Sequence, residues 1–119
     1  MITLKRQLAA ALEGVCARVV FGWPGDFAAA PLLCWREVGN RRHAQADGAE
    51  YLAELEYSVD IFAAAPEEAG EILSLADARL QDIGLRREAC AEQFEEDGAL
   101  SRISARYRAL ADAEGNIYQ

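Results

Sequence analysis

Histidine and paired cysteines, on which many catalytic and metal sites are built, are scarce in this sequence. The 119 residues include one histidine, His43, and three cysteines, Cys16, Cys34 and Cys90. The cysteines are too far apart along the chain to form a metal-binding pair, and an odd number does not suit a disulfide framework. The sequence therefore predicts no metal, no cofactor and cysteines that behave as small apolar residues.

Long apolar runs and an excess of positive charge are also missing. There is no run of about 18 apolar residues, so no membrane-spanning helix is expected. The start of the chain lacks the apolar block of a signal peptide. There are 20 acidic residues against 12 basic ones, which gives a formal net charge of -8. Such a protein repels phosphate groups, so nucleic acids and anionic membranes are disfavoured as ligands.

The composition that remains is that of a single globular domain. Hydrophobic residues make up 52% of the chain and charged residues 27%, which is typical of a folded protein. A length of 119 residues fits one domain, residues 1–119. A chain of this size buries enough surface to form a substantial core.

The predicted fold is centred on a strand followed directly by a helix. From Tyr51 to Ala63, apolar residues occupy alternate positions, which predicts a strand with one buried side. A helix is predicted over Pro66–Ile83, because proline suits a first turn and apolar residues then recur at helical spacing. Gly84 suits the end of this helix. We expect the apolar stripe of the helix to cover the odd-numbered side of the strand.

Further elements are predicted on either side of this unit. They are a helix at Ile2–Val15 and strands at Ala17–Trp23, Pro31–Val38, Leu85–Glu96 and Leu100–Ala111. Gly39–Gly48 shows no apolar period and is predicted to be a mobile loop or the tip of a long hairpin. Asp97–Gly98 is a hairpin turn signal. The predicted class is α+β, a mostly antiparallel sheet with two helices packed on one face.

Each polar group that resembles a reactive site has a simpler explanation. His43 lies in a polar stretch without a nucleophile beside it, which is typical of a solvated loop residue. Glu67 and Glu68 begin the predicted helix, where carboxylates stabilise the helix dipole. Asp112–Asn116 resembles half a calcium loop, but the glutamate required at the twelfth position is missing, which favours a plain turn. No catalytic, cofactor-binding or metal-binding residue is predicted.

Several large apolar residues have no place in the predicted core. Trp23 and Trp35 are either core or loop-packing residues or anchors of a protein interface, where aromatic side chains are enriched. Contiguous exposed apolar surface usually marks an interface. We therefore predict an interface built from the turn-rich stretch and the outer side of the central strand. Its residues are Phe21, Trp23, Phe27, Trp35, Leu52 and Phe62.

The order of features from Pro31 onward resembles a known family. The matching residues are Pro31-Leu32-Leu33-Cys34-Trp35, Asn40, Asp47-Gly48, Glu54, Val59-Asp60-Ile61-Phe62, Gly84-Leu85-Arg86-Arg87 and Arg106-Tyr107-Arg108-Ala109. Together with the intervening helix they cover most of the chain, and the N-terminal helix matches in position and character. In these features the chain is similar to the tail-completion proteins of long-tailed bacteriophages and prophages, which include tail terminators and tail-to-head joining proteins.

This resemblance implies a structural role without catalysis. The implied assembly is a ring, commonly hexameric, at the head-proximal end of the tail tube in a virion assembled in the bacterial cytoplasm. The implied partners are the tail-tube protein and the head connector protein, with DNA passing through the ring without specific binding. Two alternatives remain open, a non-viral α+β adaptor and a small-molecule-binding domain with a pocket between sheet and helices.

Overall fold

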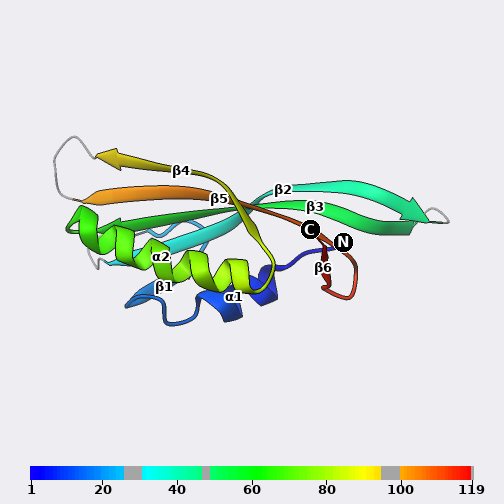
Figure 1. The fold of residues 1–119 in the computed structure, drawn as a ribbon, viewed down its shortest axis with the longest axis horizontal. Coiled ribbons are helices and arrows are strands. Elements are labelled where there is room, and N and C mark those ends of the chain that lie inside the picture. Colours follow the sequence, from blue (N-terminus) through cyan, green and yellow to red (C-terminus); the bar gives the residue numbers. More distant parts are fainter. Residues whose placement is uncertain (26–30, 47–48, 95–99, 119) are drawn as a thin grey trace.

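The computed structural model describes residues 1–25, 31–46, 49–94 and 100–118, which form an elongated molecule of 53 × 24 × 21 Å (Figure 1). In chain order the elements are α1 (Lys5–Leu12), β1 (Arg18–Phe21), β2 (Leu32–Ala46), β3 (Ala49–Ala63), α2 (Pro66–Asp82), β4 (Arg86–Phe94), β5 (Ser101–Ala111) and β6 (Ile117–Tyr118). The predicted α+β class is confirmed.

The six strands of the described residues form one sheet in the order β1-β2-β3-β5-β4, with β6 paired to β5. β1 runs parallel to β2, while the other strand pairs are antiparallel. The prediction of a mostly antiparallel sheet is therefore confirmed. β5 is the last long strand in the chain, yet it lies between β3 and β4. This order makes β3 the centre of the sheet and leaves β1 and β4 at its edges.

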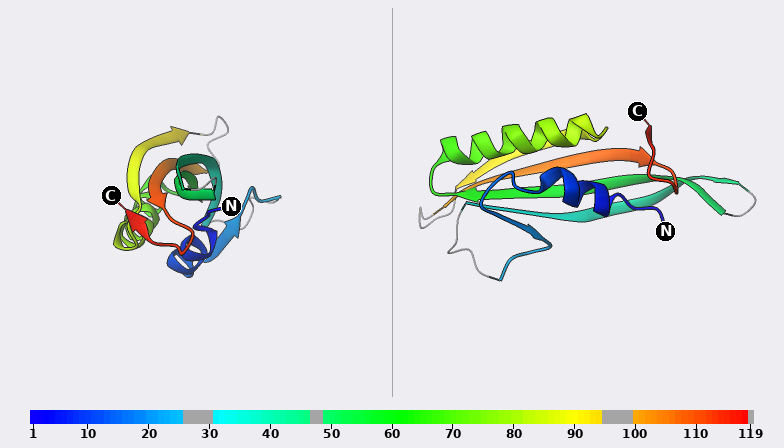
Figure 2. Two further views of the ribbon diagram at one scale, coloured as in Figure 1. Left: turned by 90° about the vertical axis from the view of Figure 1, so that its right-hand side faces the viewer. Right: turned by 90° about the horizontal axis from the view of Figure 1, so that it is seen from below.

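The core lies between β3 and the helices. The odd-numbered side chains of β3 from Ala53 to Ala63 are fully buried. They belong to one apolar cluster with Leu8 and Leu12 of α1 and Ala69, Ala76 and Leu80 of α2. Seen from below, both helices lie over the strands (Figure 2). The apolar stripe of the second helix therefore shares one cluster with the odd-numbered side of the central strand.

α2 begins where the sequence predicts and ends one residue earlier, at Asp82. Pro66 occupies its first turn with Glu67 and Glu68, and Arg79 lies in its last turn, so the charges complement the helix dipole. Gly84 then adopts a φ of 109°. A Cβ atom at this position would lie 2.9 Å from Cγ2 of Ile117 in β6. Both the positive φ and the close approach of β6 therefore require glycine.

α1 is shorter than the predicted helix Ile2–Val15. The Asn40 side-chain amide donates a hydrogen bond of 2.8 Å to the carbonyl of Ile2. The amide of Leu4 donates one of 2.9 Å to the hydroxyl of Tyr57. Because the sheet binds these backbone groups, the helix begins only at Lys5. Ile2 and Leu4 remain buried and extend the core beneath the sheet.

The β2–β3 hairpin is longer than the predicted strands. β2 pairs with β3 as far as Ala46 and Ala49. The predicted long hairpin is therefore present, but residues 39–46 form its paired strand and not its tip. The outer part of the hairpin extends beyond both helices (Figure 1). It lacks an apolar period because there is no helix layer for its residues to face. Register shifts between Glu37 and Gly39 and between Arg42 and Ala44 mark bulges along it.

Two smaller differences concern the ends of the sheet. The strand predicted at Ala17–Trp23 is limited to Arg18–Phe21. β6 was not predicted, because two residues are too few to show a period. The predicted turn at Asp97–Gly98 lies outside the described residues.

Candidate protein interface

The predicted interface residues differ in exposure. Phe21 and Trp23 are 56% and 49% exposed. Leu52 is half-buried on the hairpin, and Phe27 lies outside the described residues. Phe21 and Trp23, separated by one glycine, are therefore two exposed aromatic side chains at the β1 edge, here called the Phe21–Trp23 patch.

The prediction that Trp35 and Phe62 are exposed is wrong, because they retain only 5% and 3% of their accessible surface. Trp35 pairs with Val59 in register and faces the main core, where its ring centroid lies 6.5 Å from that of Tyr57. Phe62 lies on the opposite side of the sheet in a small second cluster. Both side chains are enclosed by this chain alone and are not available to a partner.

The backbone after β1 holds Phe21 at the sheet edge. Gly22 has a φ of 90°, and its amide donates a hydrogen bond of 2.8 Å to the carbonyl of Trp35. The Phe21 ring meets the Trp35 ring edge-on at 4.8 Å between centroids. Lys5 Nζ lies 5.5 Å from the centre of the Phe21 ring. These contacts fix the ring while leaving half of it open to solvent.

Trp23 lies over the outer face, the side of the sheet that carries the even-numbered residues of β3. Its ring meets the Phe62 ring edge-on at 5.9 Å between centroids. The guanidinium carbons of Arg102 and Arg36 lie 5.3 and 5.7 Å from the Trp23 ring centre. Arginine stacked on tryptophan is a favourable cation–π arrangement. Trp23 is thus held in position and resembles a preformed interface anchor.

A buried ion pair supports Trp23 from below. Asp60, which is 2% exposed, accepts hydrogen bonds from Arg102 Nη2 at 2.9 Å and Arg102 Nε at 3.2 Å. The Ser58 hydroxyl donates a third bond of 3.2 Å to this carboxylate. A buried charge is tolerated only when it is paired and hydrogen-bonded in this way. Arg102 therefore both neutralises Asp60 and supports the indole ring.

Cys34 lies beside this ion pair but has none of the properties of a nucleophile. The pKa of the Cys34 thiol is raised to about 11, mainly by burial and next by the charge of Asp60. The thiol is therefore protonated at neutral pH, whereas reactive cysteines have a lowered pKa. Together with Leu32 and Phe62, Cys34 forms the second apolar cluster, as predicted for a buried cysteine, whereas Cys16 is only partly buried and Cys90 is exposed.

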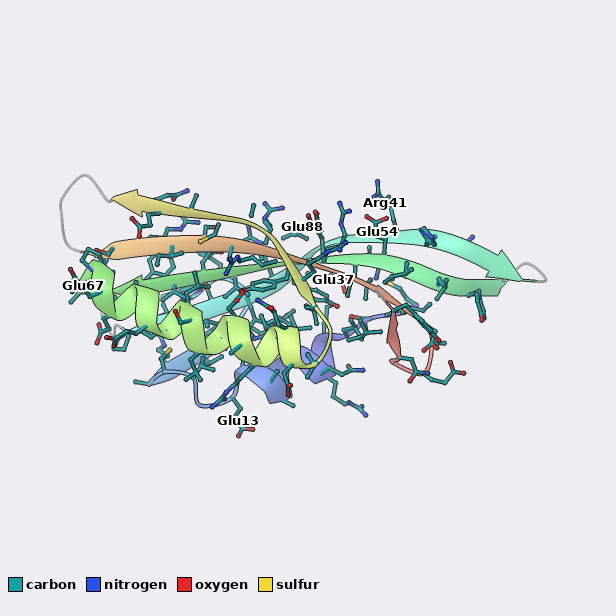
Figure 3. The ribbon with its side chains drawn as sticks, in the orientation of Figure 1. Glu13, Glu37, Arg41, Glu54, Glu67 and Glu88 are labelled. Carbon is teal, nitrogen blue, oxygen red and sulfur yellow. The ribbon has the colours of Figure 1, made fainter. Side chains whose placement is uncertain are left out.

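A belt of alternating charges crosses the outer face. Glu54 pairs with Arg41 at 2.9 Å and with Arg108 at 3.2 Å. Glu88 pairs with Arg108 at 3.7 Å and with Arg86 at 3.8 Å. Figure 3 shows Arg41, Glu54 and Glu88 on the side of the sheet away from the helices. The belt joins β2, β3, β5 and β4 and makes the outer face highly charged.

His43 lies on β2 and is exposed, not in a loop as predicted. It lines a surface groove of about 250 Å³ together with Arg86, Arg108 and Tyr118. Pockets for small molecules typically measure about 300–1,000 Å³. The described lining of this groove contains neither serine nor cysteine. The groove therefore gives little support to the small-molecule alternative.

The turn after β5 occupies the carboxylate of Asp112. Its Oδ1 accepts hydrogen bonds from the amides of Glu114 at 3.0 Å and Asn116 at 2.9 Å. Its Oδ2 accepts bonds from the Tyr118 hydroxyl at 2.7 Å and the Asn116 side chain at 3.1 Å. The Tyr118 bond is the main cause that lowers the pKa of Asp112. The predicted plain turn is confirmed, with both carboxylate oxygens engaged inside it.

Two kinds of feature are absent from the part of the chain that the structure describes. No three or more histidine, cysteine, aspartate or glutamate residues are grouped so that they could hold a metal ion. No helix in those residues is both long and apolar enough to cross a membrane.

Besides the first residue, Met1, sequence reasoning missed three other exposed apolar residues. Tyr51, Leu75 and Tyr118 are 57%, 42% and 45% exposed. Tyr51 follows the alternation of the central strand, but it lies near the start of β3, in the outer part of the hairpin. Leu75 lies outside the apolar stripe of α2. A leucine off the stripe of an amphipathic helix is the sequence feature that could have indicated its exposure.

Comparisons with known proteins show similarity at the level of structure. No protein-family model matches the sequence, and no curated protein matches it. A chain from the virion of a native gene transfer agent (GTA) particle has a similar structure, with a TM-score of 0.60 over 87% of this chain and 82% of that chain. The two sequences are 17% identical, so the similarity shows a shared fold.

Proposed function

We propose that this protein is a structural component of a phage-like particle and, more specifically, a tail-completion protein. In this role it forms a ring at the head-proximal end of the tail tube, ends tail growth and joins the tail to the head connector. The observation that carries the proposal is the fold shared with a chain of a gene transfer agent virion, which extends over most of both chains.

The surface of the molecule supports assembly. A ring requires two unlike surfaces on each subunit, because a head-to-tail contact repeats and closes by rotation. The Phe21–Trp23 patch at the β1 edge offers an apolar surface. The outer face offers a charged one, with its belt from Arg41 to Arg86. We propose that these surfaces bind neighbouring subunits, the tail-tube protein and the head connector protein.

The proposed role needs neither catalysis nor a cofactor, and DNA passes through the ring without specific binding. The protonated Cys34 thiol and the engaged Asp112 carboxylate support a structural role. The net charge of -8 disfavours adhesion to DNA phosphates. A stoichiometric metal in the purified protein, removable only with loss of the fold, would contradict this part of the proposal.

Complementation tests the proposed function. A phage or gene transfer agent lacking this gene is supplied with the parent protein or with the double variant Phe21→Ala, Trp23→Ala, and tails are measured by electron microscopy. Without the protein we expect tails of irregular length and few complete particles. The double variant should restore few particles, because the patch is lost. Tyr51→Ala, an equally exposed aromatic far along the hairpin, serves as the matched control and should restore most of them.

Two outcomes would argue against the proposal. Normal tails of defined length made without the protein would contradict a tail-completion role. A gene neighbourhood without portal, capsid or tape-measure genes would favour the non-viral adaptor instead.

A further inference from the structure

The charges of this acidic protein are separated between its two sides. Seven arginines among the described residues lie on the outer face, against four carboxylates on the same face. The arginines are Arg18, Arg36, Arg41, Arg86, Arg102, Arg106 and Arg108, and the carboxylates are Glu54, Glu56, Asp60 and Glu88. The outer face therefore carries a positive excess, although the whole chain has a net charge of -8.

The exposed side of α2 is acidic and lacks compensating charge. Glu67, Glu71 and Asp82 are exposed along one stripe of the helix. Their side chains form no ion pair or hydrogen bond with any residue that the structure describes. Arg79, the only basic residue of α2, donates hydrogen bonds to the carbonyls of Ala11 at 3.4 Å and Glu13 at 2.7 Å. It is thereby held toward α1 and leaves the stripe negative.

The two charged surfaces match in length. At about 1.5 Å per residue, the stripe from Glu67 to Asp82 measures about 22 Å. At about 3.4 Å per residue, β5 from Arg102 to Arg108 measures about 20 Å. The shortest spacings between charges also agree. Four helical residues, as from Glu67 to Glu71, cover about 6 Å, and two strand residues, as from Arg106 to Arg108, cover about 7 Å.

The middle of each surface is apolar. Leu75, which is 42% exposed, lies halfway along the α2 stripe. Ala89 and Ala91 of β4 are exposed and pair in register with Arg106 and Ser104 of β5. These alanines place two small apolar side chains beside the arginines, opposite which the Leu75 side chain of a second copy can lie.

We infer that the exposed stripe of α2 in one copy of this protein packs along β4 and β5 on the outer face of the next copy. The two surfaces lie on opposite sides of the sheet, so the contact is head-to-tail and repeats from copy to copy. The inference rests on the proposed function only for closure of this repeat into a ring. DNA is a weaker occupant of the outer face, because four carboxylates alternate with its arginines and repel phosphate.

Charge reversal tests the contact. Variant one carries Glu67→Lys and Glu71→Lys, and variant two carries Arg86→Glu and Arg106→Glu. Arg86 and Arg106 are suitable because their own ion pairs are long, 3.8 and 4.0 Å, and their side chains are 73% and 48% exposed. Thermal melting confirms that each variant folds. The milder Arg86→Gln, Arg106→Gln variant replaces variant two if that variant does not fold.

Sedimentation velocity at protein concentrations up to roughly 1 mM, where even weak contacts form, measures the association. We expect the parent protein to self-associate, and less so when ionic strength rises from about 0.1 to about 1 M and the Debye length falls from about 10 to about 3 Å. Each variant alone should associate about tenfold more weakly. An equimolar mixture of the two should recover the parent behaviour, because every contact then joins opposite charges again.

Several results would overturn the inference. A parent protein that stays monomeric at the highest concentration would do so, as would reversed variants that associate like the parent or a mixture that recovers nothing. Binding of a short DNA duplex that variant two loses, with self-association unchanged, would assign the outer face to nucleic acid instead. Tail assembly in cells is measured separately. If self-association depends on these charges but tails form normally in cells that lack the protein, the proposed function is contradicted and this inference still stands.

Discussion

Trp35 and Trp23 lie on opposite sides of one sheet and have different roles. Trp35 belongs to the main core, between the rings of Phe21 and Tyr57. Trp23 is half exposed over the outer face, where Arg36 and Arg102 hold its ring. Of the two tryptophans only Trp35 is enclosed by the chain itself. Substituting Trp35 should therefore affect folding, whereas substituting Trp23 should mainly affect association.

We expect Trp35→Ala to lower the free energy of unfolding by roughly 3–5 kcal/mol, as for other large core residues. Trp23→Ala should cost only about 1 kcal/mol, since much of its ring is already in water and mainly the cation–π contacts are lost. Urea unfolding followed by circular dichroism measures both values. Equal losses for the two variants would show that the Trp23 ring is as deeply packed as the Trp35 ring.

The sequence could not distinguish the two tryptophans in advance. Strand alternation groups Leu33 with Trp35, but which side of that strand faces the core depends on pairing with β3, more than twenty residues away. Phe62 has the same difficulty, because its cover comes from Leu32 and Cys34. Phe21 and Trp23 were identified correctly as exposed aromatics, since they adjoin a turn. Contacts distant in sequence therefore decided which part of the candidate site was predictable.

At the scale of elements, the junction between α2 and β6 depends on one glycine. Gly84 has a positive φ, and β6 packs directly over it through Ile117. Gly70 inside α2 is the opposite case, because a Cβ there would meet nothing within 4 Å. The two glycines of one helical segment therefore respond oppositely to the same substitution.

Gly84→Ala should destabilise the protein by roughly 1–3 kcal/mol, because alanine strains the backbone and overlaps Ile117. Gly70→Ala, the matched control, should stabilise it by about 0.5–1 kcal/mol through higher helix propensity. Thermal unfolding of both variants gives the comparison. A Gly84→Ala variant that melts at or above the parent temperature would mean that the junction relaxes without cost.

Elements with a strong local signal were predicted well, and those defined by tertiary contacts were not. Period, proline and glycine sufficed for α2 and the inner part of β3. The start of α1 depends on hydrogen bonds from Asn40 and to Tyr57, which leave no local pattern. The outer hairpin faces no helix layer and β6 has only two residues, so side-chain periodicity could not reveal them.

At the scale of the whole molecule, two tyrosine hydroxyls tie separate parts together. The Tyr57 hydroxyl accepts a bond from Leu4 and donates one of 2.8 Å to Glu37, which joins the N-terminal segment to the sheet. The Tyr107 hydroxyl donates a bond of 2.7 Å to Asp77 of α2. Burial is the main cause that raises the pKa of both groups, that of Tyr57 to about 12.

These pKa shifts make global stability sensitive to alkaline pH. The folded state keeps the Tyr57 proton more tightly than the unfolded state, whose tyrosine pKa is about 10. The contribution is therefore complete below pH of about 10 and is lost as pH rises through about 12. A shift of about two units corresponds to roughly 3 kcal/mol. Urea unfolding across this range should show the decline, and Tyr57→Phe should make it shallower, with the Tyr107 contribution remaining; an unchanged slope in that variant would contradict the assignment.

The position of β5 in the sheet has a consequence for synthesis of the chain. β4 pairs only with β5 among the described strands, and β5 also forms one side of β3. A nascent chain that has emerged only as far as β4 therefore exposes one edge of β3 and leaves β4 without a partner. Exposed edges of this kind are templates for aggregation. Folding on the ribosome is thus completed only when β5 inserts, so any delay in translating residues 101–111 extends the period in which neighbouring nascent chains can pair wrongly.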